Sequence, residues 1–163
     1  MIWRGPKKNA TIKQFVDDVI WGELDYLIVD TPPGTSDEHL AVVENLKKYN
    51  PEGAILVTTP QMVSIADVRR EVTFCRKLNV KMIGLIENMS GYVCPHCADC
   101  TNVFSVGGGE ELCKKESIPF LGRIPIDPTL GQCGESGNAF MTHFPTSATL
   151  KAITEFVKGR DGK

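Results

Sequence analysis

The sequence predicts an α/β fold in which helices cover a parallel sheet. Four apolar runs of 4–5 residues are almost free of charge, which is typical of strands that are buried on both faces. Amphipathic helical patterns separate these runs, and this alternation favours parallel strands. Polar and turn-forming residues follow each run, at the edge of a parallel sheet where ligands usually bind. The expected strands are 26–29, 54–57, 82–86 and 120–124.

The first two helices are expected on either side of the first strand. One should cover residues 11–20. Ser36 or Asp37 is suited to cap the second, which should run to about Tyr49. The apolar side chains that would share one face of this second helix are Leu40, Val43 and Leu46.

Three further helices are expected in the later connections. Ser64 with Asp67 resembles a capping box, and the helix after it carries one apolar stripe. The stripe consists of Ile65, Val68, Val72 and Cys75. The other two helices should cover 109–116 and 147–158. The glycine run 107–109 does not follow an apolar strand and no Lys-Ser or Lys-Thr closes it, so we interpret it as a flexible helix entry.

The composition is that of an ordinary soluble globular domain. The chain has 163 residues, of which 42% are hydrophobic and 23% are charged, and its formal net charge is -2. This balance gives no electrostatic basis for binding nucleic acid or an anionic membrane. No apolar run approaches the roughly 18 residues of a transmembrane helix, and the start of the sequence lacks a signal-peptide core. Three disulfides are disfavoured because such frameworks belong to small secreted chains.

Three of the six cysteines form the strongest chemical motif, in the run CPHCADC at 94–100. C-x2-C-x2-C is a soft-metal spacing, because two intervening residues let successive thiolates turn toward one centre. Tetrahedral zinc or a cubane cluster needs four ligands, and the run offers three cysteines. A zinc site that adds His96 reaches that number, although His96 adjoins Cys97 and would need a strained local geometry.

The other three cysteines lack a metal-like spacing. Cys75 lies on the apolar stripe of its helix, so we expect a buried core thiol there. Cys113 and Cys133 are expected to be structural or free.

The first apolar run ends in Asp30, followed by TPPG at 31–34. An aspartate at a strand tip can hold magnesium through its water shell, and the following glycine lets a loop approach a γ-phosphate. An apolar run that ends in Asp is by itself weak, because an ordinary turn can begin in the same way. The longer segment 27–37 is far more specific, and it looks like the Walker B and switch segment of a P-loop NTPase.

Five segments together resemble the Mrp/Nbp branch of the deviant-Walker, MinD-like P-loop ATPases. They are 3–9, 30–39, 87–91, 94–100 and 104–112. The resemblance covers nearly the whole chain. It implies a parallel-sheet P-loop NTPase fold and a nucleotide site built from the ends of the strands.

The resemblance also implies roles for the residues of that nucleotide site. Asp30 would be the magnesium-side aspartate of the switch. Asn88 would contact the adenine base, and Pro125, Ile126 and Asp127 would flank it. ATP and Mg²⁺ would be the cofactors of the intact family member.

For the cysteine run, the resemblance implies a shared metal site. Cys94 and Cys97 would ligate a [4Fe-4S] cluster that bridges two subunits, each of which gives two cysteines. This arrangement supplies the four ligands that a cubane needs. Cys100 remains open as a spare ligand, a transfer relay or a structural thiol.

One defining element of the family is absent from these 163 residues, because they contain no G-K-G-G-x-G-K-[ST] loop. That loop supplies the N–H groups and lysines that cradle the phosphates. We therefore expect 1–163 to be a single partial domain, truncated at the N-terminus so that the P-loop strand is missing, with a cysteine-bearing insertion at about 90–106. Because neighbouring strands would then have unpaired edges, the chain alone should be poorly stable or need a partner strand, and should not hydrolyse ATP.

The function implied by the resemblance is a scaffold that assembles [4Fe-4S] clusters and transfers them to cytosolic and nuclear apoproteins, with ATP gating the process. The expected partners are a second copy or a related paralogous scaffold ATPase, and apoprotein-targeting factors, with neither nucleic acid nor membrane. The expected location is cytoplasmic, with the nucleus as a second site. The alternative is a zinc-binding, non-catalytic interaction module on a degenerate NTPase domain.

Overall fold

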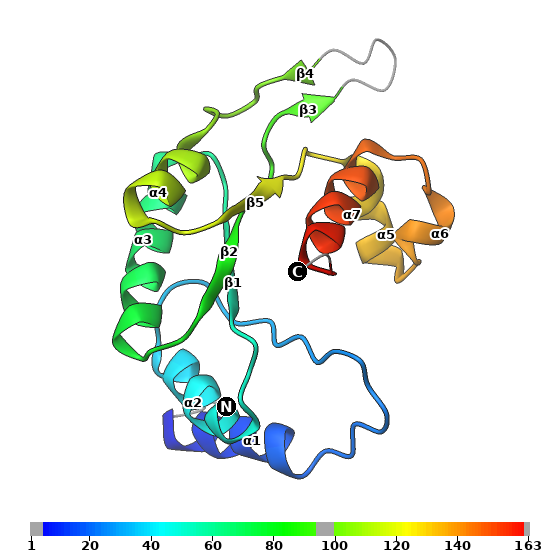
Figure 1. Cartoon of the computed structure of the whole chain (residues 1–163). Helices are drawn as coiled ribbons and strands as arrows, with labels where there is room; N and C mark the ends of the chain where they lie inside the picture. The colour runs from blue at the N-terminus through cyan, green and yellow to red at the C-terminus, as the bar shows by residue number, and fades with distance from the viewer. Residues whose placement is uncertain (1–4, 94–99, 162–163) are drawn as a thin grey trace.

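A three-stranded parallel sheet forms the centre of the computed structural model, which describes residues 5–93 and 100–161 (Figure 1). The strands are β1 (Ala54–Thr58), β2 (Met82–Glu87) and β5 (Phe120–Arg123), in the order β1-β2-β5. Helices α3 (Met62–Lys77) and α4 (Gly108–Glu116) lie on one side of the sheet. The parallel α/β prediction is therefore confirmed, with three of its four expected strands.

The main core lies between the sheet and α3 and α4. All four residues of the predicted α3 stripe are buried, because their 3- and 4-residue spacing places them on one helix face. They pack with side chains from β1, β2 and α4. The buried cluster consists of Leu56, Ile65, Val68, Val72, Cys75, Leu85, Leu112, Cys113 and Ile118.

The start of α3 differs from the prediction in one detail. Its N-cap is Gln61, so Ser64 falls within the first turn and does not cap the helix. The Ser64 hydroxyl instead accepts a hydrogen bond from the backbone N of Thr59 at 3.1 Å. The expected capping box of Ser64 and Asp67 is therefore wrong, and Ser64 instead ties the end of β1 to α3.

The opposite face of β1 is uncovered. Leu56 and Thr58 point into the core, whereas Ile55 and Val57 are 42% and 52% exposed. Among the described residues β1 pairs with β2 alone, so it is an edge strand of the sheet. The expectation that this run is buried on both faces is wrong, because no described element packs on its outer side. We call Ile55 and Val57 the outer face of β1.

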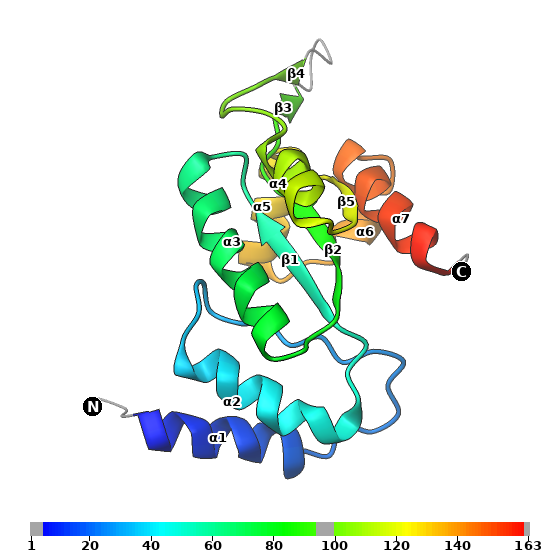
Figure 2. The same ribbon diagram turned by 60° about the vertical axis from the view of Figure 1, so that its left-hand side comes forward.

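Helices α1 (Gly5–Asp17) and α2 (Asp37–Leu46) pack side by side below the sheet (Figure 2). Lys8 and Glu38 join them by an ion pair of 2.6 Å. Compared with the helix predicted at 11–20, α1 begins earlier and ends earlier. The short 3-10 helix η1 (Lys47–Tyr49) continues α2 to the predicted end.

Ser36 is the N-cap of α2, as one of the two expected alternatives. Its partner is His39, which is buried and accepts from the Ser36 backbone N at 3.1 Å. The His39 ring also contacts the Phe74 ring edge-on, with centroids 6.0 Å apart. This contact ties the start of α2 to α3.

The apolar run 26–29 does not form a strand. The segment between α1 and α2 is extended and runs past the lower end of the sheet in both views. All four side chains of the run are exposed, and Ile28 is 88% exposed. The strand prediction for 26–29 is wrong because a strand needs a hydrogen-bonded neighbour, and none of the described strands pairs with this segment.

A small hairpin projects from the other end of the sheet. It consists of β3 (Tyr92–Val93) and β4 (Cys100–Thr101), which pair antiparallel between β2 and α4 (Figure 1). Cys94 and Cys97, the predicted cluster ligands, lie outside the described residues, and so does His96. Only the backbone of Cys100 is described, as part of β4.

Three helices follow β5 and form a second, smaller core. They are α5 (Pro128–Ser136), α6 (Phe140–His143) and α7 (Ala148–Asp161). Cys133, Phe140 and Leu150 are buried between them. The sequence predicted α7 but neither α5 nor α6. Within 5–93 and 100–161, none of the helices combines the length and the apolar character that a membrane crossing requires.

Candidate functional site

Three polar residues meet at the carboxyl edge of the sheet, one from the end of each strand. Thr58, Glu87 and Arg123 are register partners across β1, β2 and β5. The backbone continues this pairing beyond the strands. Asn88 N donates to Thr58 O at 2.7 Å, and Ile124 N donates to Glu87 O at 2.9 Å. The residues that follow β2 and β5 are thereby held close together, as predicted for this edge.

Glu87 lies at the centre of this edge and is 0% exposed. Its Oε1 accepts hydrogen bonds from Ser90 Oγ at 2.6 Å and from Arg123 Nε at 3.3 Å. Its Oε2 accepts from the backbone N of Gly109 at 2.7 Å. A buried carboxylate is tolerated only with such compensation, so these contacts explain how a charge can end the central strand.

Asn88 follows Glu87 and is half-buried. Its Oδ1 accepts from the backbone N of Met89 at 2.9 Å, and Met89 has a positive φ of 57°. Among the described residues no hydrogen bond engages the Nδ2 of Asn88. The tight turn therefore fixes the side chain, while its two donor hydrogens have no partner among the described residues.

The segment 124–127 runs beside the residues that follow Asn88. Ser90 N donates to Ile124 O at 2.9 Å, and Ile126 N donates to Gly91 O at 2.8 Å. Ile126 also forms an isolated parallel bridge with Tyr92. The structure therefore brings Pro125 and Ile126 to the same edge as Asn88, although they are far apart in sequence.

Asp127 is the N-cap of α5, with Pro128 at the first helical position. Its Oδ1 accepts from Thr129 N at 2.9 Å and from Thr129 Oγ1 at 2.6 Å, and its Oδ2 accepts from Thr149 Oγ1 at 2.7 Å. Burial opposes ionisation, but the hydrogen bonds from Thr129 and Thr149 outweigh it and hold the pKa of Asp127 below its usual range. Protein donors already occupy both carboxylate oxygens, so the role that the structure shows for Asp127 is to cap α5 and to link it to α7.

Asp30 is not part of this group. It belongs to the extended segment between α1 and α2, which runs at the opposite end of the sheet from β3 and β4 (Figure 1). The reason is the missing strand at 26–29, since Asp30 was expected at the tip of that strand. The structure thus assembles the residues expected near the base but not the one expected near the magnesium ion.

The three cysteines whose side chains the structure describes are buried. Cys75, Cys113 and Cys133 are free thiols. Burial raises the pKa of Cys75, with a smaller effect from Glu71. Burial, followed by the nearby Glu110 and Glu87, raises the pKa of Cys113 to about 11. The core role predicted for Cys75 is confirmed, and no three potential ligands gather as a metal site among the side chains that the structure describes.

These thiols give a direct prediction. In the folded chain at pH 7.5, iodoacetamide should leave Cys75 and Cys113 unmodified, because alkylation requires a thiolate and access to solvent. Unfolding in urea should expose both to rapid modification. Mass spectrometry of digested protein measures this for each cysteine. Modification of Cys113 at the same rate before and after unfolding would contradict the described core.

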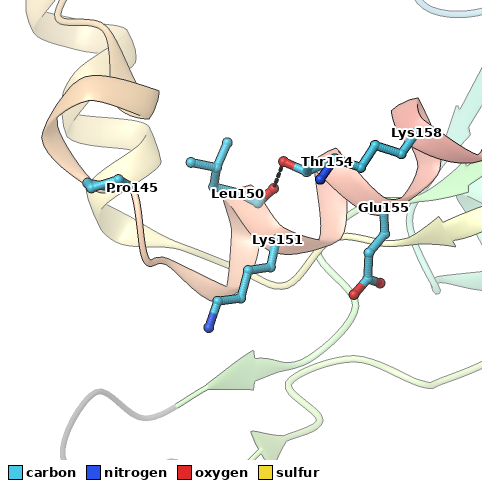
Figure 3. Close-up of a pocket in the computed structure, with 6 residues that line it drawn as sticks. All are labelled: Pro145, Leu150, Lys151, Thr154, Glu155 and Lys158. Carbon is cyan, nitrogen blue, oxygen red and sulfur yellow. Dashed lines mark hydrogen bonds between the residues drawn. The ribbon is translucent and has the colours of Figure 1, made fainter. Parts of the chain in front are cut away.

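A surface hollow lies elsewhere, against α7 (Figure 3). It has a volume of about 330 Å³ and is wide open. Its lining combines two lysines and a glutamate with less polar residues, and Thr154 Oγ1 donates to Leu150 O at 2.7 Å. The lining residues are Pro145, Leu150, Lys151, Thr154, Glu155 and Lys158. It contains none of the predicted site residues.

Sequence reasoning missed the importance of Glu87 and Arg123. Glu87 lies in the segment 87–91 that carries the family resemblance, and Arg123 lies in the expected strand 120–124, but neither received a role of its own. A charge at the end of each of two adjacent buried runs was the available indication, because buried charges occur almost only in pairs.

Solved structures identify the class to which this fold belongs. The MinD cell division ATPase of Pyrococcus furiosus matches with a TM-score of 0.65 at 21% identity, over 98% of this chain and 59% of that one. This likeness shows the MinD-like P-loop NTPase fold. The chain belongs to the ParA family, in the group described as NUBPL iron-transfer P-loop NTPases, whose profile matches residues 1–159.

Individual relatives are more similar still. The cytosolic Fe-S cluster assembly factor NUBP2 of Gallus gallus is 62% identical over 158 residues, which are 97% of this chain and 58% of the relative. The human protein of that name is 60% identical over 97% of this chain and 58% of its own length. The predicted resemblance to the Mrp/Nbp branch, and within it to nucleotide-binding protein 2 of eukaryotic cytosolic cluster assembly, is confirmed. The chain spans about 58% of the length of these relatives.

A solved nucleotide-binding protein from Archaeoglobus fulgidus, in complex with ADP, is 39% identical. Its TM-score is 0.69, over 79% of this chain and 52% of that chain.

Proposed function

We propose that the chain is part of a scaffold that assembles [4Fe-4S] clusters and transfers them to cytosolic and nuclear apoproteins. The single observation that supports this most is its 62% identity, over 97% of its residues, to a relative named as a cytosolic Fe-S cluster assembly factor. In this proposal the cluster is cargo. The scaffold works in the cytoplasm, with the nucleus as a second location, and apoprotein-targeting factors receive the cluster.

The cargo would be held by the cysteine-bearing insertion at about 90–106. Cys94 and Cys97 stand between β3 and β4 in sequence, and two such pairs, one from each of two subunits, would complete the four ligands. The second subunit is either another copy or a related paralogous scaffold ATPase. Thiolates suit iron–sulfur iron, and two ligands per subunit suit a cluster that must leave. Cys100 would serve as a spare ligand or relay.

ATP and Mg²⁺ would act in the whole protein. The free donor side of Asn88 fits a contact with the acceptor nitrogens of adenine, and Pro125 and Ile126, which lie at the same edge of the sheet, would flank the base. The saturated carboxylate of Asp127 fits a supporting role at the same edge. Asp30 would hold magnesium once its segment reaches the phosphates.

Anaerobic reconstitution with iron and sulfide tests the proposal. The chain should gain the broad visible absorbance of a [4Fe-4S] cluster, and Cys94→Ala or Cys97→Ala should abolish it because two of the four ligands are lost from each dimer. Cys133→Ala is the matched control, since Cys133 is buried in the second core and should leave the absorbance unchanged. A colourless zinc adduct that requires His96 would contradict the scaffold and favour the zinc-binding module.

A further inference from the structure

The chain leaves the sheet after β2, forms the β3–β4 hairpin and returns to the sheet at α4 (Figure 1). We call residues 88–93 the incoming arm and residues 100–109 the outgoing arm. The outgoing arm ends in the first turn of α4. The separation and direction of these two arms determine where the hairpin lies relative to the sheet.

One carboxylate contacts both arms. Ser90, on the incoming arm, donates its hydroxyl to Glu87 Oε1 at 2.6 Å. Gly109, on the outgoing arm, donates its backbone N–H to Glu87 Oε2 at 2.7 Å. Because Glu87 is fully buried, water does not compete for either oxygen, and charge-assisted hydrogen bonds are strong in such surroundings.

The glycine run is suited to this contact. A Cβ at position 109 would lie 3.0 Å from Glu87 Oε2 and 3.0 Å from Thr58 Cγ2, so a side chain there would push α4 away from the carboxylate. Gly107 caps the helix with a φ of 83°, which other residues rarely adopt. The three glycines thus let the N-terminus of α4 approach Glu87 closely.

Arg123 attaches the carboxylate to the sheet. Its Nε lies 3.3 Å from Glu87 Oε1, and its Nη2 donates to Glu110 Oε2 at 2.5 Å. Arg123 therefore balances the buried charge from β5 and reaches α4 at the same time. Both arms are consequently held relative to the sheet as well as to each other.

We infer that Glu87 is the positioning residue of the hairpin, with one carboxylate oxygen fixing each arm. The inference rests on the proposed function only in taking this hairpin as the carrier of the cluster ligands. The backbone of the incoming arm is also bonded to Ile124 and Ile126, so the arm that Glu87 holds is paired with the segment after β5. Glu87 touches neither cargo nor nucleotide in this role and acts through the arms.

Hydrogen exchange of the full chain, without any cluster, tests this first. Ser90→Ala removes the bond to the incoming arm and leaves no buried donor unpaired. Amides at 88–93 should exchange about tenfold faster, which is the effect of losing one hydrogen bond to a charged group. Exchange in β1 and α3 should stay unchanged. Ser136→Ala is the matched control, because its hydroxyl donates to Gln132 O on a distant helix.

A second pair of variants separates positioning from general stability. Glu87→Ala should speed exchange in both arms. Glu87→Gln keeps the length and the contacts to both arms, because its amide oxygen can accept from Gly109 N–H and its amide nitrogen can donate to Ser90 Oγ, while it gives up only the bond from Arg123. On reconstituted protein, a chelator should remove iron faster from Ser90→Ala and Glu87→Ala than from the Glu87→Gln and Ser136→Ala variants. If wild type binds no cluster, the proposed function fails while the exchange result still decides the inference. Unchanged arm exchange in Ser90→Ala, or equal acceleration in α3, would overturn it.

Discussion

Gly84→Ala is expected to lower the free energy of unfolding by about 2–3 kcal/mol, as overpacking of a filled core does. A Cβ at this position would lie 2.6 Å from Leu121 Cγ and 2.8 Å from the backbone O of Pro119. That carbonyl accepts a hydrogen bond from Leu85 N at 2.9 Å, so it cannot withdraw without breaking the pairing of β2 with β5. Urea titration followed by far-UV circular dichroism measures the change.

Gly131→Ala is the matched control for this substitution. Gly131 lies inside α5, where an added Cβ would meet nothing within 4 Å. Alanine favours a helix over glycine, so this variant should be more stable than wild type by about 0.5–1 kcal/mol. Equal effects at the two positions would show that β2 and β5 are not packed as described.

Asp127→Ala should cost about 2 kcal/mol at neutral pH. The substitution removes the N-cap of α5 and leaves the hydroxyl of Thr149, which is 1% exposed, without its acceptor. Because Thr149 lies at the start of α7, the loss should loosen the second core more than the first. Denaturant titrations of the variant and of Glu111→Ala, whose carboxylate makes an exposed pair with Lys115, measure the difference.

The effect of Asp127 should also depend on pH in a defined direction. Its pKa is lowered on folding, so the ionised carboxylate stabilises the chain fully above its ordinary pKa of 3.8. This contribution is lost as the pH falls through the lower pKa of the folded state. The gap between wild type and Asp127→Ala should therefore be constant from neutral pH to about 5 and shrink only below pH 3.8. A gap that shrinks near neutral pH would contradict the lowered pKa.

Much of the sheet and of α3 could be predicted because their patterns are local. β1, β2 and β5 are apolar runs bounded by turn residues, and the stripe from Ile65 to Cys75 follows the helical period. Asn88 and Pro125 could be placed at one edge because parallel strands end on the same side of a sheet. These predictions needed no knowledge of which strands are neighbours.

The remaining features depend on contacts between distant segments. Residues 26–29 have the composition of a strand, but strand formation depends on a neighbour that no local pattern reveals. Glu87 receives its bonds from Ser90, Gly109 and Arg123, and only the folded chain shows that these groups converge. The carboxylate of Asp127 accepts a hydrogen bond from Thr149, 22 residues later, and no local pattern reveals that contact.

The outer face of β1 bears on the lifetime of the chain in a cell. Ile55 and Val57 present branched apolar side chains on a strand that is at the edge of the described sheet, a combination that promotes association with other chains. Cellular quality control, through chaperones and proteases, acts on proteins that display such surfaces. The cellular abundance of the chain would then depend mainly on how quickly a partner covers the outer face of β1. It would depend less on how quickly the main core folds.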